Sequence, residues 1–160
     1  MNNKRLLGML VLFVFLALPV HASMVSFLLV ETGPDSRPSG TQYINVWEGG
    51  LMEAFFDAGR IVTNSPILQL ETKPVNSLSG PIEVDFNDAV EGGAEYFIVG
   101  FLEYRGQGAA APAEIHLRIY RTDNRRMIYE QRFPVGIGRS SDEEYLNAQD
   151  AGRIILSHLD

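Results

Sequence analysis

The spacing of apolar positions changes several times along the chain, and each change predicts an element. The run MVSFLLVE at 24–31 is apolar and rich in β-branched residues, which predicts a first, central strand. Residues 42–59 predict a helix that ends at Gly59 and has one apolar face. That face consists of Tyr43, Trp47, Leu51, Phe55 and Ala58. The pair Gly49 and Gly50 in its middle indicates either a break or close packing on a sheet.

The middle of the chain predicts two short elements and one strong strand. Residues 61–63 form a short strand, and a further apolar stretch follows Pro66. A short helix is expected in IEVDFNDAVEGGA, with Asp85 as its cap and the Gly92–Gly93 pair as its end. The run YFIVGFL at 96–102 is apolar on both faces, which is typical of a central strand.

The C-terminal part predicts a β-hairpin and a last helix. The arms IHLRIYR and RMIYEQRF flank TDN at 122–124. In the first arm we expect one buried face and one wet face. The expected buried side chains are Ile115, Leu117 and Ile119, and the expected wet ones are His116, Arg118 and Tyr120. Ser141 followed by Glu144 predicts a capping box that opens the last helix.

These elements define the expected fold class as α/β (α+β), a mixed β-sheet with helices packed on it. The expected order is strand, helix, strand, helix, strand, strand, strand, helix, so the chain finishes in an antiparallel hairpin and a helix. No internal repeat and no second boundary are visible, so residues 23–160 are expected to form a single globular domain.

The N-terminus predicts export. Lys4 and Arg5 precede the apolar stretch LLGMLVLFVFLALPV, and the small-residue pattern VHAS follows. Residues 1–22 therefore read as a signal peptide cleaved between Ala22 and Ser23. A retained membrane anchor is the alternative, but the apolar run is shorter than the ~20 residues of a spanning helix.

Charge and cysteine content narrow the class of partner. Loss of two basic residues with the signal peptide takes the formal charge from −7 to −9. Such a protein is a poor partner for nucleic acid or anionic lipid, and we expect no membrane span after cleavage. The chain has no cysteine, so it has neither disulfides nor a lipidated N-terminal cysteine. We expect a periplasmic or secreted protein, and a homo-oligomer is possible.

Three stretches have some features of ligand-binding loops, but none predicts a cofactor or a metal. In ETGPDSRPSGT at 31–41 the glycines are too far apart for a P-loop and no lysine precedes the threonine, which favours a solvated connection. GIGRSSDEE at 136–144 could bind an anion, but its own acids occupy the helix start. DFNDAVEGG at 85–93 fails the calcium-loop spacing. The remaining histidines, His116 and His158, lack a neighbouring ligand in the sequence.

Two sets of side chains remain as candidate binding residues. Aromatic side chains could line a pocket but are more typical of a core; these are Trp47, Phe55, Phe56, Tyr96 and Phe101. The hairpin concentrates arginine and tyrosine, residue types that are enriched at protein interfaces. The candidate partner-binding residues are Arg118, Tyr120, Arg121, Arg125, Arg126 and Arg132. A simply solvated sheet face is the other interpretation.

The segment GGAEYFIVGFLEYRG, with the hairpin after it, resembles a recurring envelope module. That module occurs in the curli secretion channel protein CsgG, in the N-terminal domain of TolB and in LpoB, a lipoprotein activator of a peptidoglycan synthase. Its strand of the type ADYLVVGxL is matched by 94–102, although the lipidated cysteine of the lipoprotein members is missing here. The resemblance implies a non-catalytic periplasmic scaffold or adaptor domain and supplies no catalytic residue.

Two functions follow as hypotheses. The first is a non-enzymatic periplasmic or secreted scaffold or adaptor that contacts another cell-envelope protein through the hairpin face and the glycine-rich loop 106–112. The alternative is a small-molecule or glycan binding protein, or a hydrolase, with a site between the first helix and the sheet. Its contributors would be Trp47, Asp57 and Glu95.

Overall fold

A computed structural model of the chain describes residues 23–33, 41–76, 78–104, 112–135 and 140–159. The strands are β1 (Met24–Thr32), β2 (Ile61–Asn64), β3 (Leu68–Leu70), β4 (Tyr96–Glu103), β5 (Glu114–Arg121) and β6 (Met127–Pro134). The helices of the described part are α2 (Thr41–Asp57), α3 (Pro81–Glu91) and α4 (Ser141–Leu156). In that part of the chain, no helix is long and apolar enough to cross a membrane.

The six strands form one mixed sheet in the order β2-β1-β4-β5-β6, and β3 pairs with the far end of β1. Strand β1 is parallel to β2, β3 and β4, whereas β5 is antiparallel to both of its neighbours, β4 and β6. The expected fold class is therefore confirmed, and β1 and β4 are central as predicted. The apolar stretch after Pro66 contributes one strand more than the predicted order contains.

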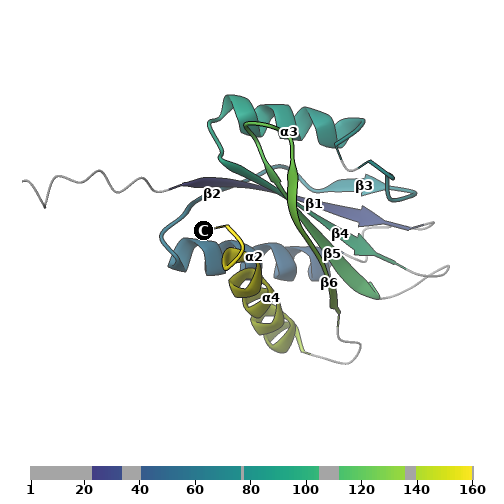
Figure 1. The fold of residues 1–160 in the computed structure, drawn as a ribbon. Helices are drawn as coiled ribbons and strands as arrows, with labels where there is room; N and C mark the ends of the chain where they lie inside the picture. The colour runs from purple at the N-terminus through teal and green to yellow at the C-terminus, as the bar shows by residue number, and fades with distance from the viewer. Residues whose placement is uncertain (1–22, 34–40, 77, 105–111, 136–139, 160) are drawn as a thin grey trace, which may run out of the picture.

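Helices cover the two faces of the sheet unequally (Figure 1). Helices α2 and α4 lie together on one face, while α3 lies alone on the other. The larger core includes Trp47, Leu51 and Phe55 of α2 against the β1 and β4 side chains. The smaller core places Ile82 and Phe86 of α3 on the opposite side of the same strands. Because α3 is the one described helix on this face of the sheet, other side chains cover the rest of the face.

Glycine in α2 serves helix–helix contact rather than a break or contact with the sheet. Helix α2 runs through Gly49 and Gly50 without interruption. A Cβ at Gly50 would lie 2.7 Å from both the Cβ of Ala148 and the carbonyl oxygen of Tyr145 on α4. A Cβ at Gly152 would lie 2.7 Å from the Cβ of Ala54. The two helices approach this closely because both lack a side chain at the crossing.

Two predicted caps are wrong in position. Helix α3 begins at Pro81, four residues before the expected cap Asp85, because proline suits the first helical turn, where its missing N–H has no partner to lose. The capping box of α4 is formed by Ser140 and Glu143, one residue earlier than expected. The Ser140 hydroxyl accepts from the Glu143 N–H at 3.2 Å, and the Glu143 carboxylate accepts from the Ser140 N–H at 2.7 Å.

The hairpin departs from the predicted wet face. Ile115, Leu117 and Ile119 are fully buried, as expected. However, His116 and Tyr120 on the other face are only 2% and 7% exposed. Tyr120 belongs to the core under α3, and His116 is enclosed by charged neighbours. The alternation of residues assigned the side chains to the correct two faces of β5, but both faces are covered by other side chains at these positions.

Candidate functional site

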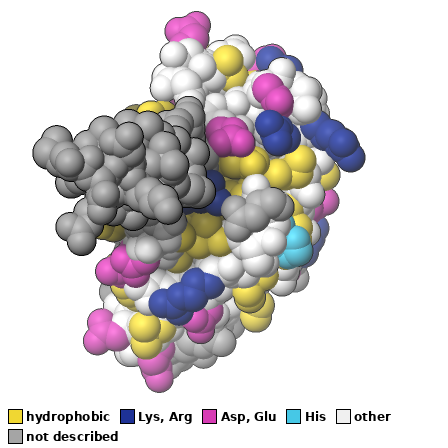
Figure 2. Space-filling model, turned by 60° about the vertical axis from the view of Figure 1, so that its left-hand side comes forward, with side chains coloured by type: hydrophobic (Ala, Val, Ile, Leu, Met, Phe, Trp, Pro, Cys, Tyr) yellow, Lys and Arg dark blue, Asp and Glu magenta, His cyan; other side chains and the backbone are white. Residues whose placement is uncertain are grey.

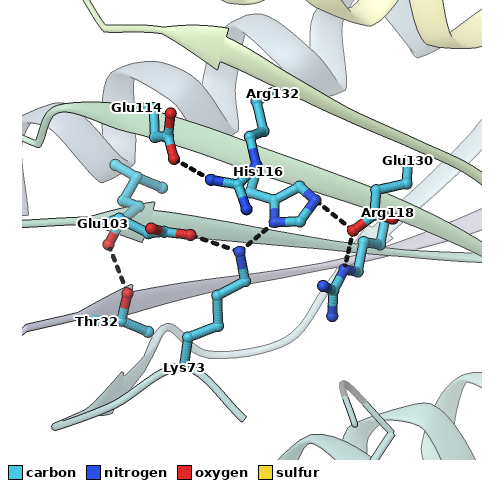
Figure 3. Close-up of polar contacts among 9 residues, drawn as sticks. Thr32, Lys73, Glu103, Glu114, His116, Arg118, Glu130 and Arg132 are labelled. Atoms are coloured by element: carbon cyan, nitrogen blue, oxygen red, sulfur yellow. Dashed lines mark hydrogen bonds and ion pairs between the residues drawn. The ribbon is translucent and has the colours of Figure 1, made fainter. Parts of the chain in front are cut away.

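A cluster of charged side chains covers β4, β5 and β6 on the face of the sheet against which α3 packs, which we call the α3 face (Figure 3). Three positions stand side by side across these strands, because Phe101 pairs with His116 and His116 pairs with Arg132. Neighbouring positions on the same face add acids. We call the whole set the His116 cluster; it comprises Lys73, Glu103, Glu114, His116, Arg118, Glu130 and Arg132.

His116 is held from both sides of its ring. Its Nε2 lies 2.6 Å from Oε1 of Glu130, and its Nδ1 contacts Nζ of Lys73. The carboxylate requires a proton on Nε2, and the ammonium requires a lone pair on Nδ1. The geometry therefore fits a neutral imidazole with its proton on Nε2.

The electrostatics agree with a neutral ring. Burial, together with the positive charges of Lys73 and Arg118, lowers the pKa of His116 to about 4. Burial also lowers the pKa of Lys73, against the hydrogen bond from its ammonium to Glu103. Both nitrogens of His116 are engaged and its exposed fraction is 2%, so the ring offers no free base to a substrate.

Lys73 ties a connecting segment to the sheet. Its Nζ lies 2.5 Å from Oε1 of Glu103 and 5.2 Å from the centre of the Phe101 ring. Burial works to raise the pKa of Glu103, but the hydrogen bond and charge of Lys73 outweigh it and the pKa is lowered. One side chain from the β3–α3 connection thus reaches an acid on β4 and the imidazole on β5.

The outer members of the cluster are paired ions. Nε of Arg118 lies 2.8 Å from Oε1 of Glu130, and Nη1 of Arg132 lies 2.5 Å from Oε1 of Glu114. Burial works against the charge of Glu130, but its contacts with Arg118 and His116 lower its pKa. The Arg132 side chain is 54% exposed and that of Glu130 39%, so these two form the solvent-facing rim.

The structure divides the predicted hairpin residues into two groups and a core residue. Arg118 and Arg132 belong to the His116 cluster. Arg121 and Arg125 lie toward the turn, where Arg121 pairs with Asp123 at 3.2 Å. Tyr120 is buried in the core, with an exposed fraction of 7%.

Arg125 fastens the turn to α3. Its Nη2 lies 2.6 Å from Oε1 of Glu83, and its guanidinium carbon lies 4.8 Å from the centre of the Phe86 ring. Its backbone has φ 58°, in the left-handed region. Arg126, the neighbouring residue, is exposed, and its carbonyl accepts from the N–H of Arg121 at 3.0 Å. These contacts give Arg125 a structural role in holding the hairpin against α3.

The residues of the alternative ligand site are not presented to a common pocket. Trp47 is fully buried, and its Nε1 donates to Oε1 of Glu144 at 2.9 Å across the α2–α4 contact. Asp57 and Glu95 are exposed. Among the other aromatic candidates, Phe56 is 72% exposed, whereas Phe55, Tyr96 and Phe101 belong to the core as expected.

Sequence reasoning missed the partners of the hairpin arginines. Glu103, Glu114 and Glu130 carried a usable signal, since alternation along neighbouring strands places them on the arginine face. Lys73 gave no such signal in the sequence, because it lies in a polar connection without a regular pattern. The described part of the chain holds no group of three or more side chains arranged to bind a metal ion.

Several predicted features lie outside the described residues. They are the signal peptide 1–22, nearly all of loop 106–112, most of the stretch 31–41, and residues 136–139 before α4.

Figure 2 shows one face of the molecule, on which acidic and basic side chains are interspersed with apolar ones rather than gathered by sign.

Comparisons with known proteins find likeness only among solved structures. No family model matches the chain, and no curated protein matches it in sequence. Among solved structures, TolB from Acinetobacter baumannii is 16% identical with a TM-score of 0.44; the match covers 86% of this chain and 27% of TolB. TolB is one of the three proteins of the resemblance described above, whereas the likeness to CsgG and LpoB stays a prediction.

Two further matches span most of both chains. A PelC dodecamer from Paraburkholderia phytofirmans is 12% identical, with a TM-score of 0.48 and coverage of 86% of this chain and 89% of PelC. Lipoprotein GNA1162 from Neisseria meningitidis is 14% identical, with a TM-score of 0.46 and coverage of 87% and 99%. All three of these TM-scores are below 0.5.

Proposed function

We propose that the chain is a non-enzymatic domain of the cell envelope that acts by contact with another envelope protein. The contact surfaces in this proposal are the hairpin face at the rim of the His116 cluster and the glycine-rich loop 106–112. Export through the signal peptide 1–22, with cleavage between Ala22 and Ser23, and folding of residues 23–160 as one domain belong to the same proposal.

The observation that supports the proposal most strongly is that ion pairs cover the part of the α3 face beyond the helix. Where α3 does not reach, ion pairs replace apolar side chains above Phe101, which is itself fully buried. An arginine and a glutamate, Arg132 and Glu130, remain partly exposed at the rim. Arginine next to acids on a pair of strands suits a polar, specific protein contact more than it suits catalysis.

The internal pairing of the cluster supports contact rather than catalysis. A general base must have a free lone pair within reach of a substrate proton. His116 has both ring nitrogens in use, and Lys73 binds both Glu103 and His116. The described groups of this face are therefore arranged to hold one another in place.

Charge reversal tests the proposal. The chain with Arg126→Glu and Arg132→Glu is used to capture proteins from an envelope extract, beside the wild-type chain. We expect wild type to retain at least one envelope protein stoichiometrically and the double variant to lose most of it, because a reversed rim repels the partner's acids. Arg153→Glu on α4, whose side chain is 57% exposed, is the matched control and should capture normally.

Folding of each variant is checked by circular dichroism before capture. Equal capture by wild type and by the folded double variant would refute the hairpin face as the contact surface.

A further inference from the structure

A second surface lies on the opposite side of the sheet, between α2, β2 and α4. It is a hollow of about 320 Å³, which we call the α2–β2 hollow. Its lining consists of Met52, Glu53, Phe56, Val62 and Tyr145. Phe56 is 72% exposed, although neighbouring residues Phe55 and Ala54 on the same helix are buried. Exposed aromatic side chains of this kind are enriched at protein interfaces.

The hollow adjoins β2, the edge strand of the sheet in the described part of the chain. The N–H of Ile61 donates to Ser23 and the N–H of Ser65 donates to Phe27, both on the β1 side. In a parallel pair these directions alternate, so the N–H and C=O groups of Val62 and Asn64 face away from β1. No described strand pairs with β2 on that side. An extended peptide can therefore add to β2 while one of its side chains enters the hollow.

The charges around the hollow are acidic. Glu53 lines it and accepts from the Tyr145 hydroxyl at 2.6 Å, and its hydrogen bond is the main cause of the raised pKa of Tyr145. The charge of Asp57 acts on the same hydroxyl in the same direction. Farther along β2, Glu48 accepts from Asn64 at 3.0 Å. None of the lining residues is basic, and the nearby Arg60 donates to Ser23 instead.

We propose that the α2–β2 hollow docks an extended peptide segment of a partner protein that carries a bulky apolar side chain between lysines or arginines. The apolar side chain packs against Phe56, Met52 and Val62. The backbone of the segment bonds to Val62 and Asn64, and its basic side chains face Glu53 and Asp57. Apolar burial, main-chain pairing and charge thus act on three parts of one short segment.

A peptide selection tests this surface directly. A random heptapeptide library displayed on phage is selected on the whole exported chain, and enriched peptides are resynthesised for titration. We expect enrichment of an apolar residue flanked by lysine or arginine. Phe56→Ser should weaken binding about tenfold, since it removes the apolar wall. The pair Glu53→Gln with Asp57→Asn should weaken it several-fold and reduce its salt dependence.

Two controls separate this inference from others. Val84→Ser removes an apolar side chain of similar exposure, 60%, from α3 on the other face, and it should leave peptide binding unchanged. Arg126→Glu with Arg132→Glu should also leave it unchanged, so failure of the hairpin proposal and failure of this one are distinguishable. Failure to enrich basic-apolar peptides, or equal binding of the selected peptides to the Phe56→Ser protein, would overturn the inference.

Discussion

His116 shows how one residue can link the pH of the solution to the stability of a surface. Its imidazole accepts from the Lys73 ammonium and donates to the Glu130 carboxylate. Protonation of Nδ1 would remove the lone pair that Lys73 uses and place two positive charges in contact. The neutral ring is therefore a requirement of this arrangement of the His116 cluster.

Stability should fall as this histidine becomes protonated in the unfolded state. The folded-state pKa of His116 is lowered to about 4 from an ordinary 6.5, so the unfolded chain binds more protons between these values. We expect the free energy of unfolding to be roughly 2 kcal/mol lower at pH 5 than at pH 7.5 from this residue. Urea titrations of wild type and His116→Gln measure it.

The loss of stability from His116 and the loss from the glutamates fall in different pH ranges. The lowered pKa values of Glu103 and Glu130 also favour the folded state at neutral pH, but their effect is lost only as pH falls below about 4.5. His116→Gln should therefore have a flatter profile than wild type between pH 7.5 and about 4, and should approach the wild-type slope only below that range. A wild-type slope across the whole range in the variant would count against a neutral buried His116.

Trp47 and Glu144 form a second buried contact whose loss has a cost. The indole N–H of Trp47 donates to a carboxylate that is only 1% exposed. We expect Trp47→Phe to lower the free energy of unfolding by about 2 kcal/mol, because a buried acceptor loses a donor along with some packing. Glu144→Gln should cost less, since the amide oxygen still accepts. Denaturant unfolding of both variants checks the order, which would be reversed if the acid served only its own helix.

At the scale of elements, the α2–α4 contact depends on two glycines. Alanine normally stabilises a helix by about 1 kcal/mol over glycine. At Gly50 and Gly152, however, the new Cβ would meet atoms of the opposite helix at 2.7 Å. We expect each alanine variant to be destabilised by about 1–3 kcal/mol, through overpacking. Thermal unfolding measures the change.

Gly49 is the matched control in the same helix. A Cβ there would lie 3.1 Å from Cε2 of Tyr145, the far part of a side chain that can move. We expect Gly49→Ala to be near neutral or stabilising. Equal destabilisation at Gly49 and Gly50 would mean that the helix, and not the contact, is sensitive to substitution.

The start of α4 also gives an element-scale expectation. The two reciprocal hydrogen bonds of the capping box belong to Ser140. Ser140→Ala should lower the free energy of unfolding by about 1 kcal/mol. Ser141→Ala, at the position that the sequence predicted for the cap, should cost less. A larger effect at Ser141 would contradict the observed cap position.

The elements could largely be predicted from the sequence because their apolar periods are clear. The β1 and β4 runs are apolar at nearly every position, and the hairpin arms alternate, so strand type and centrality followed directly. Strand β3 was missed because three residues after a proline carry too short a period. The caps were misplaced, by five residues in α3 and by one in α4, because serine pairs and short acidic runs offer several equivalent registers.

For the whole molecule, the site was less predictable than the fold. The concentration of arginine on the hairpin was visible in the sequence, and Arg118 and Arg132 do lie together. Their charge balance was not visible, since Lys73 and Glu103 are 30 residues apart and meet only in the folded chain. Unequal coverage of the two sheet faces likewise depends on where α3 packs, which no local pattern encodes.

Site-specific cross-linking in living cells tests the central claim most directly, namely that the hairpin face is where this protein meets its partner. A photoreactive amino acid replaces Arg132 at the rim of the His116 cluster, or Arg153 on α4 as the control; their side chains are 54% and 57% exposed. We expect a discrete covalent adduct with another envelope protein from position 132 and none from position 153. No adduct from position 132, or the same adduct from both positions, would contradict the account.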